Sequence, residues 1–113
     1  MGVTKIRGVN VADWTVVFTD ENYTASKDDH VCIDSSAMIT IQLPANPAVS
    51  DRVKITDVEG GCLLFPCTVD RNGTLMMKQA SNDSIALNFV TVTYTYLNPT
   101  YGWIKEFLEI QTS

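Results

Sequence analysis

The chain is poor in the residues from which catalytic and metal sites are usually built. Histidine occurs once, at His30, so one chain cannot supply the two or more histidines of a common metal site. No serine stands in a glycine-flanked elbow, and any serine or cysteine nucleophile would depend on His30 as its base. The sequence also has neither a P-loop nor a dinucleotide-binding glycine pattern. We therefore predict that the chain is not an enzyme and has no catalytic residues, no metal site and no cofactor.

Positive charge and long apolar runs are also scarce. Eight Lys and Arg stand against thirteen Asp and Glu, a formal net charge of −5, and the basic residues are not clustered. Because phosphate binding needs a clustered cationic surface, we expect no nucleic-acid partner. No apolar run approaches the roughly 20 residues needed to cross a bilayer, and residues 1–11 contain no hydrophobic signal core. We expect no membrane insertion, and synthesis in a cytoplasm.

The three cysteines predict neither a disulfide framework nor a zinc knuckle. Their number is odd, and only Cys62 and Cys67 are close in the sequence. We expect all three to be reduced. Cys32 lies in the alternating segment 30–33 and is predicted to be a small core residue.

His30 and the acidic residues are expected in solvated turns. His30 follows two aspartates, which favours a loop position, and the alternative is that three copies around a threefold axis bind a metal. Carboxylates can also pair for glycosidic cleavage or hold Ca²⁺, but here they lack the spacing of a calcium loop and stand where strands are expected to end. These carboxylates are Asp28, Asp29, Asp34, Asp51, Asp57 and Glu59.

What the sequence does contain is a repeated alternation of apolar and polar residues. In residues 38–43 the apolar side chains alternate with Thr and Gln, the period of a strand with one buried and one wet face. Residues 52–58 repeat this pattern, with Val53 and Ile55 predicted to point inward. Both segments are therefore predicted to be strands.

The C-terminal part of the chain predicts a hairpin. Residues 88–97 place three threonines on one face and alternating valines and tyrosines on the other, and such β-branched and aromatic residues favour a pleated strand. A turn follows at residues 98–102, and residues 103–110 are predicted to return as the second strand.

Turn residues punctuate the sequence at short spacing. Residues 70–73 predict a tight turn between strands at 67–69 and 74–77, and the best helix candidate, residues 81–87, is short. Strands separated by turns every 8 to 12 residues or so, about the spacing found in sandwiches, predict an all-β domain. We expect a small antiparallel β-sandwich or a jelly-roll-like barrel.

Two interpretations of residues 1–20 stay open. Residues 10–18 carry two large aromatic side chains outside the later pattern. The segment is either a first strand or an arm that docks on a neighbouring protein. Residues 21–113 are predicted to form a single β-sandwich module.

Aromatic side chains are the remaining candidates for a binding surface. The first of them, near the N-terminus, are candidates for anchoring the chain to a partner. Those of the C-terminal hairpin pack in the core, fill a subunit interface or line a sugar-binding face. The open strand edges of so small a domain favour oligomerisation. The predicted partner-interface residues are Trp14, Val16, Phe18, Tyr94, Tyr96, Tyr101 and Trp103.

A series of short motifs gives the chain a family resemblance. Two short segments near the start of the chain are followed by a strand ending in Leu-Pro, a strand ending in Asp and glycines, an Asn-Gly turn and a final Gly-Trp pair. The matching segments are residues 23–25, 30–34, 39–45, 51–61, 68–73 and 101–103. In this order the chain resembles the β-modules of bacteriophage tail fibres, tailspikes and head or neck appendages. Two departures concern loop shape: Ser50 stands where a glycine is common, and residues 62–65 are more apolar than the usual polar stretch.

The resemblance implies a virion structural protein, made in the bacterial cytoplasm, that is usually a homotrimer. Such a protein serves as a fibre, appendage or capsid-decoration subunit in particle assembly, stability or host attachment. Its expected partners are larger capsid, neck or tail proteins and, in host attachment, a host surface glycan. Because the module makes up nearly the whole chain, we expect a small component that attaches through residues 1–20. The alternative is a free carbohydrate-binding module in which Tyr101 and Trp103 stack on sugar rings.

Overall fold

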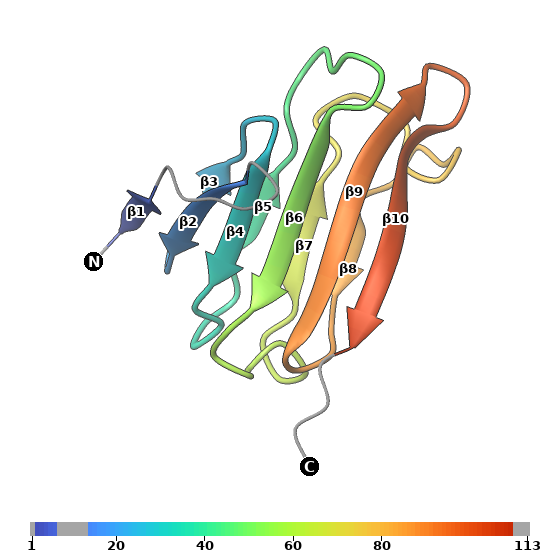
Figure 1. Cartoon of the computed structure of the whole chain (residues 1–113). Helices are drawn as coiled ribbons and strands as arrows, with labels where there is room; N and C mark the ends of the chain where they lie inside the picture. The colour runs from blue at the N-terminus through green and yellow to red at the C-terminus, as the bar shows by residue number, and fades with distance from the viewer. Residues whose placement is uncertain (1, 7–13, 110–113) are drawn as a thin grey trace.

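The fold consists of two β-sheets that face each other (Figure 1). It is given by a computed structural model, which describes residues 2–6 and 14–109. This described part contains strands and turns but no helix, so the predicted all-β class is confirmed. The strands are β1 (Val3–Ile6), β2 (Thr15–Thr19), β3 (Tyr23–Thr24), β4 (Asp29–Ile33), β5 (Thr40–Gln42), β6 (Arg52–Asp57), β7 (Cys67–Asp70), β8 (Asp83–Ile85), β9 (Val90–Asn98) and β10 (Gly102–Glu109).

The sequence predicted an antiparallel sandwich, but four of the strand pairs are parallel. Sheet A has the order β1-β2-β4-β6-β9-β10, and sheet B has the order β3-β5-β7-β8. From β2 to β7 the chain alternates between the sheets, so each new strand lies parallel to the previous strand of its own sheet. The remaining pairs are antiparallel. The sheets are therefore mixed, because a strand of the facing sheet serves as the crossover that a parallel pair requires.

The core fills the space between the two sheets, and the predicted faces of the strands are confirmed. In β9 the residues alternate between buried and half-buried, with the valines and tyrosines inward and the threonines outward. Val53 and Ile55 of β6 are fully buried, as is Ile41 of β5. Period-two hydrophobicity thus fixes which side of each strand joins the core.

The predicted C-terminal hairpin is also confirmed. Strands β9 and β10 pair from Val90 to Asn98, with a bulge at Gly102/Trp103. Asn98 closes the turn, because its side-chain oxygen accepts hydrogen bonds from the N–H groups of Thr100 and Tyr101.

The two sheets are linked where the hairpin faces β8. The Tyr94 hydroxyl donates a 2.7 Å hydrogen bond to Asp83, and Lys105 Nζ lies 3.0 Å from both oxygens of the same carboxylate. Burial, followed by the charge and hydrogen bond of Asp83, raises the pKa of Tyr94. The tyrosine therefore stays neutral and acts as a donor.

Three local predictions fare differently. The helix candidate at residues 81–87 is wrong, because it contains strand β8. The turn at residues 70–73 is present, but residues 74–77 do not return as a strand, and β7 pairs with β8 instead. Within residues 1–20, β2 is an integral strand of sheet A, whereas residue 1 and residues 7–13 of the predicted arm lie outside the described residues.

Candidate functional site

One end of the sandwich carries a set of loops with exposed apolar side chains. It is the end where β2, β4 and β6 finish and β9 begins, at the bottom of Figure 1. We call it the acidic end and define it by residues 20–22, 34–39, 58–66 and 86–89. Its exposed large apolar residues are Met38, Val58, Leu63, Leu64 and Leu87.

A single buried carboxylate holds three of these loops together. Asp57, the last residue of β6, is 1% exposed. Its carboxylate accepts a 2.6 Å hydrogen bond from Ser35 Oγ in the loop after β4. It also accepts hydrogen bonds from backbone N–H groups in the loops before β7 and before β9, at 2.9–3.2 Å; these donors are Glu59, Gly60, Cys62 and Phe89. The loops are therefore fixed to the sheet and to one another.

These hydrogen bonds keep Asp57 ionised. Burial alone would raise the pKa of its carboxyl group. The hydrogen bonds from Ser35 and from three backbone N–H groups favour the charged form, and the net result is a pKa below the ordinary range of an aspartate. The neighbouring Cys62 is affected in the opposite direction, since burial and the Asp57 charge raise its pKa to about 12.

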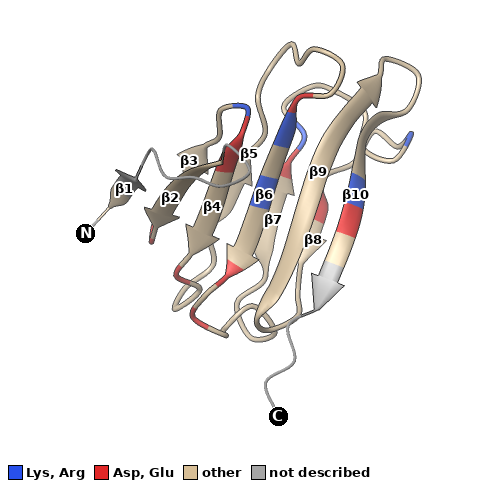
Figure 2. Ribbon diagram, viewed as in Figure 1, with Lys and Arg blue, Asp and Glu red and all other residues tan. Residues whose placement is uncertain are grey.

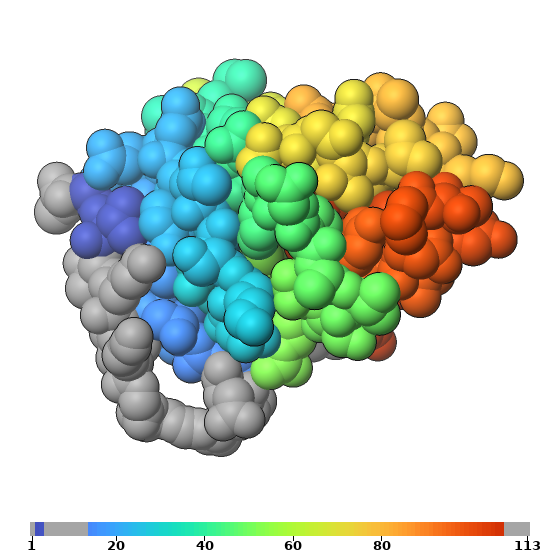
Figure 3. Space-filling view, turned by 90° about the horizontal axis from the view of Figure 1, so that it is seen from above, coloured from blue at the N-terminus to red at the C-terminus, as the bar shows by residue number. Residues whose placement is uncertain are grey.

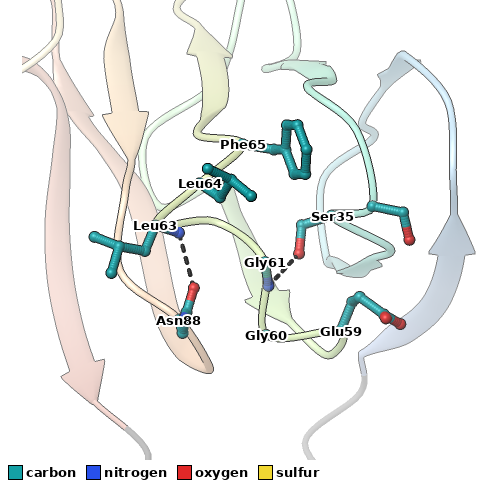
Figure 4. A pocket seen from close by; sticks show the side chains of 9 residues that line it. Ser35, Glu59, Gly60, Gly61, Leu63, Leu64, Phe65 and Asn88 are labelled. Atoms are coloured by element: carbon teal, nitrogen blue, oxygen red, sulfur yellow. Dashed lines mark hydrogen bonds between the residues drawn. The ribbon is translucent and has the colours of Figure 1, made fainter.

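The loop after β6 also depends on the close approach of two backbones. The N–H of Gly61 donates a 2.8 Å hydrogen bond to Ser35 Oγ (Figure 4). A Cβ atom on Gly61 would lie 2.4 Å from the carbonyl oxygen of Ser35, so only glycine fits without a shift. Two residues later, the N–H of Leu63 donates a 2.8 Å hydrogen bond to Asn88 Oδ1.

An open pocket of about 410 Å³ lies between the loops at 34–39 and 58–66. In Figure 4, Leu64 and Phe65 lie on the side of their loop that faces Ser35, and Leu63 points the other way, toward the side of Asn88. Leu63 is 66% and Leu64 is 74% exposed. Hydrogen-bonded loops thus present uncovered leucines, which is typical of a protein-contact surface.

The charge of this end is of one sign. Its loops contain Asp20, Glu21, Asp34 and Glu59, and no Lys or Arg occurs in these four segments. Figure 2 shows the acidic residues at the ends of β2, β4 and β6. Glu59 belongs to the lining of the same pocket as Leu63 and Leu64.

Three of the predicted interface residues lie in the chain's own core. Trp103 and Tyr94 have no exposed surface and Tyr96 is buried, so none of the three is open to a partner on this chain's surface. They face inward because the pleat of β9 and β10 turns them toward sheet B, and Trp103 meets Tyr96 edge to face, with ring centroids 5.8 Å apart. These three side chains pack in the core, which was the alternative to an interface. Tyr101 is exposed, in the turn between the two strands.

The other predicted interface residues lie on or beside the outer side of sheet A. Val16 and Phe18 alternate with the buried Val17 and are half-buried. Trp14 is half-buried immediately before β2, with the Arg52 guanidinium 3.9 Å and Lys54 Nζ 4.5 Å from its ring centroid. Their role as a partner interface stays a prediction.

His30 is not the solvated loop residue that the sequence suggested. It belongs to β4, it is half-buried, and its Nε2 lies 2.8 Å from the Thr56 hydroxyl. Burial, with a smaller contribution from the Lys54 charge, lowers the pKa of His30 to about 4. The imidazole is therefore neutral near pH 7.

Two of the six carboxylates expected in solvated turns are buried instead. They are Asp57 and Asp29, and Asp29 accepts hydrogen bonds from the Tyr23 hydroxyl at 2.7 Å and the Ser26 N–H at 2.9 Å. Strand ends in this fold lie beneath crossing loops, and a carboxylate there can satisfy their N–H groups. The remaining four are half-buried or exposed at strand ends, as expected: Asp28, Asp34, Asp51 and Glu59.

The cysteine prediction is right in one respect and wrong in another. All three cysteines are free thiols. Cys32, however, lies on the outer face of β4 and is only half-buried, because Val31 and Ile33 on either side point into the core. The buried cysteines are Cys62 and Cys67, and burial raises the pKa of Cys67 to about 12 as well.

One feature of the sequence pointed to the acidic end, although the prediction of strands made no use of it. Residues 62–65 stood out as more apolar than a loop normally is, and two of them, Leu63 and Leu64, are among the most exposed large apolar residues of the described chain. Asp57 gave no such signal, since its partners come from three separate loops. Only the fold brings them together.

No protein family and no curated protein matches this chain. Among the residues with a described position, no group of three or more His, Cys, Asp or Glu side chains is arranged to hold a metal ion. The same part of the chain contains no helix that is long and apolar enough to span a membrane.

Proposed function

We propose that the chain is a non-enzymatic structural protein of a bacteriophage virion, made in the bacterial cytoplasm. It serves as a fibre, appendage or capsid-decoration subunit that contributes to particle assembly, stability or host attachment. It forms a homotrimer and binds a larger capsid, neck or tail protein. The virion assignment comes from the resemblance in the order of motifs.

The observation that carries a structural role is the acidic end. Neighbouring large apolar side chains that are exposed together on a soluble protein often mark a site of protein contact. Here Leu63 and Leu64 are uncovered while Asp57 fixes the loop that carries them. Fixed apolar side chains lose little conformational entropy when a partner covers them, which suits a permanent protein contact.

Ser50 supports the resemblance to the phage modules. It stands at the position where those modules commonly have glycine, and its φ of 77° lies in the left-handed region that glycine tolerates best. The loop therefore has a glycine-like backbone conformation at this position although the residue is a serine.

The carbohydrate-binding alternative loses one of its two residues. Trp103 is fully buried under Tyr96 and sheet B, so it has no face on which a sugar ring could stack. Tyr101 alone remains exposed of that pair. No observation favours this function over a structural one.

Peptide counting by mass spectrometry on gradient-purified virus particles tests the proposed function. We expect peptides of this chain at a fixed copy number per particle. Hundreds of copies would place it on the capsid, and a few copies would place it on the neck or tail. If the chain stays in the soluble lysate fraction and is missing from the particles, the virion assignment is wrong.

Light scattering of the purified chain across a concentration series tests the homotrimer. We expect a particle with three times the 12.5 kDa mass of one chain. A single-chain mass at every concentration would contradict the trimer without touching the virion assignment.

A further inference from the structure

We infer that the acidic end binds a basic segment of a partner protein that also carries a large apolar side chain. The inference rests on the proposed structural function and names its surface and the chemistry of its partner. The three steps that lead to it concern shape, rigidity and charge.

The shape of the site fits an apolar side chain. The pocket between the loops at 34–39 and 58–66 is open, and Leu63, Leu64 and Phe65 provide its apolar lining. Covering an exposed leucine stabilises a complex by about 1.5–3 kcal/mol before the costs of association. A partner that inserts an apolar side chain here therefore gains more than one that binds through polar contacts alone.

The loops that line the pocket are already in place. Ser35 is buried and joins both loops, because its hydroxyl donates to Asp57 and accepts from Gly61. The third loop is attached through the bond from Leu63 to Asn88. A partner would thus meet a preformed surface, which reduces the entropy lost on binding.

The charge selects the partner. Glu59 and Asp34 flank the pocket loops, Asp20 and Glu21 lie in the next loop of the same end, and the described loops there contain no cation. The two ion pairs found among the described residues, Arg52 with Asp28 and Lys105 with Asp83, do not involve Glu59, Asp34 or Glu21. A surface on which carboxylates outnumber cations attracts cations and repels anionic groups such as phospholipid headgroups and nucleic acids.

A second copy of the chain fits this surface less well. The opposite end of the sandwich, which comprises residues 25–28, 43–51, 71–82 and 99–101, faces the viewer in Figure 3. It contains Lys27, Arg71 and Lys78 but also Asp28 and Asp51, so its charges nearly cancel. Charge complementarity therefore favours a different protein with a lysine- or arginine-rich segment.

The probe for the test is a short synthetic peptide in which leucines are flanked by lysines, compared with a peptide that has glutamate at each lysine position. The isotope-labelled full chain is titrated with each peptide and its backbone amide NMR signals are followed. We expect the lysine peptide to shift signals of residues 59–64 and Asn88, and to lose affinity as salt is added. We expect no saturable binding of the glutamate peptide.

Matched variants distinguish binding of the lysine peptide at the acidic end from its general attraction to an acidic protein. Leu64→Ser and Glu59→Lys should each weaken binding of the lysine peptide on the order of tenfold. Two controls change the same kinds of residue elsewhere: Val49→Ser, which is 64% exposed at the opposite end, and Glu106→Lys on β10. Both controls should bind as the unchanged chain does. If Leu64→Ser misfolds, Leu63→Ser replaces it.

Several outcomes would overturn the inference. Equal effects of the variants and their controls, or shifts centred on the outer face of sheet A, would mean that the acidic end is not the binding surface. A trimer that falls apart on Leu64→Ser would make a second copy the occupant. Particles that contain the chain, together with a peptide that does not bind, would leave the proposed function standing and the inference wrong. Binding without incorporation into particles would do the reverse.

Discussion

The two ends of the sandwich are held together by different means. At the acidic end, one carboxylate receives donors from three loops, so that these loops are fixed as a unit. At the opposite end the contacts are separate: Asp29 holds Tyr23 and Ser26, and Arg52 pairs with Asp28 at 3.0 Å. A shared anchor makes the position of one loop depend on the others. With separate contacts, one loop can be displaced without displacing the others.

Backbone strain is also distributed unequally. Of the seven described non-glycine residues with positive φ, Phe89 lies at the acidic end and the other six lie at the opposite end: Asp28, Asn46, Ser50, Asn72, Met77 and Lys78. A positive φ costs an L-residue roughly 1–2 kcal/mol, somewhat less for Asn and Asp. The acidic end is thus hydrogen-bonded and nearly unstrained, which suits a surface that must keep its shape.

The strongest test of this difference between the ends removes the shared anchor, the carboxylate of Asp57. Asp57→Asn leaves several N–H donors without a charged acceptor, and we expect the free energy of unfolding to fall by about 3 kcal/mol. Asp29→Asn, the matched change at the opposite end, keeps an amide oxygen for the two donors that share Asp29 Oδ2 but removes the charge of the acceptor, and it should cost about 1–2 kcal/mol. Urea unfolding measures both. Equal losses would show that Asp57 is no stronger an anchor than Asp29.

Two glycines separate the effect of close packing from that of backbone conformation. Gly61→Ala should destabilise the chain by about 2 kcal/mol, because the added Cβ meets the Ser35 carbonyl oxygen. Gly73, at the opposite end, has φ +87° and open space around it, so Gly73→Ala should cost about 1 kcal/mol through strain alone. Thermal melts compare them, and a larger loss for Gly73→Ala would contradict the packing of the acidic end.

His30, on β4, and Asp57, at the acidic end, should make stability depend on pH in different ranges. The pKa of His30 is about 4 in the folded chain against an ordinary 6.5, so the unfolded chain takes up its proton first and stability falls as the pH drops from 6.5 toward 4. The pKa of Asp57 is lowered, so its contribution is present above the ordinary aspartate pKa of about 4 and is lost as the pH falls further.

Chemical unfolding at a series of pH values checks both windows. His30→Gln should flatten the change between pH 6.5 and 4, whereas Asp57→Asn should keep that slope and lose the one below it. An unchanged slope in the His30→Gln variant would show that another group is responsible.

The smallest expected effect concerns Ser50. Because its φ is positive, Ser50→Gly relieves strain and should raise the free energy of unfolding by about 0.5 kcal/mol after the entropy that glycine loses on folding. Ser81→Gly, at an exposed position whose φ is not positive, is the control and should lower stability slightly. A loss in the Ser50→Gly variant would argue against strain in this loop.

Local features of the fold were predictable from the sequence. Alternation in residues 38–43, 52–58 and 88–97 identified β5, β6 and β9 and their inward faces, because the pleat makes side-chain direction a local property. The C-terminal hairpin followed from a turn between two such segments.

Strand direction was not predictable in the same way. A glycine or proline turn ends a strand equally well whether the chain folds back within one sheet or crosses to the facing sheet. The sequence therefore could not distinguish an antiparallel meander from the alternation between sheets that makes β2, β4 and β6 parallel.

The candidate site was predictable only in part. The apolar residues 62–65 were visible as an anomaly, but their exposure depends on the anchor at Asp57, whose donors are dispersed along the chain. The sequence could not decide between core and interface for the aromatic residues of β9 and β10, because an inward-facing aromatic and an interface aromatic have the same sequence pattern. Burial alone separates them.

The alternation of the chain between the two sheets has a consequence for folding kinetics. Central strand β6 must pair with β4, made earlier, and with β9, made much later, so sheet A is incomplete until the C-terminus is available. Such high contact order predicts slow folding, on the order of milliseconds to seconds. During synthesis, the unpaired backbone edge of β6 would stay open until β9 has left the ribosome, and that interval is when the chain is most exposed to aggregation.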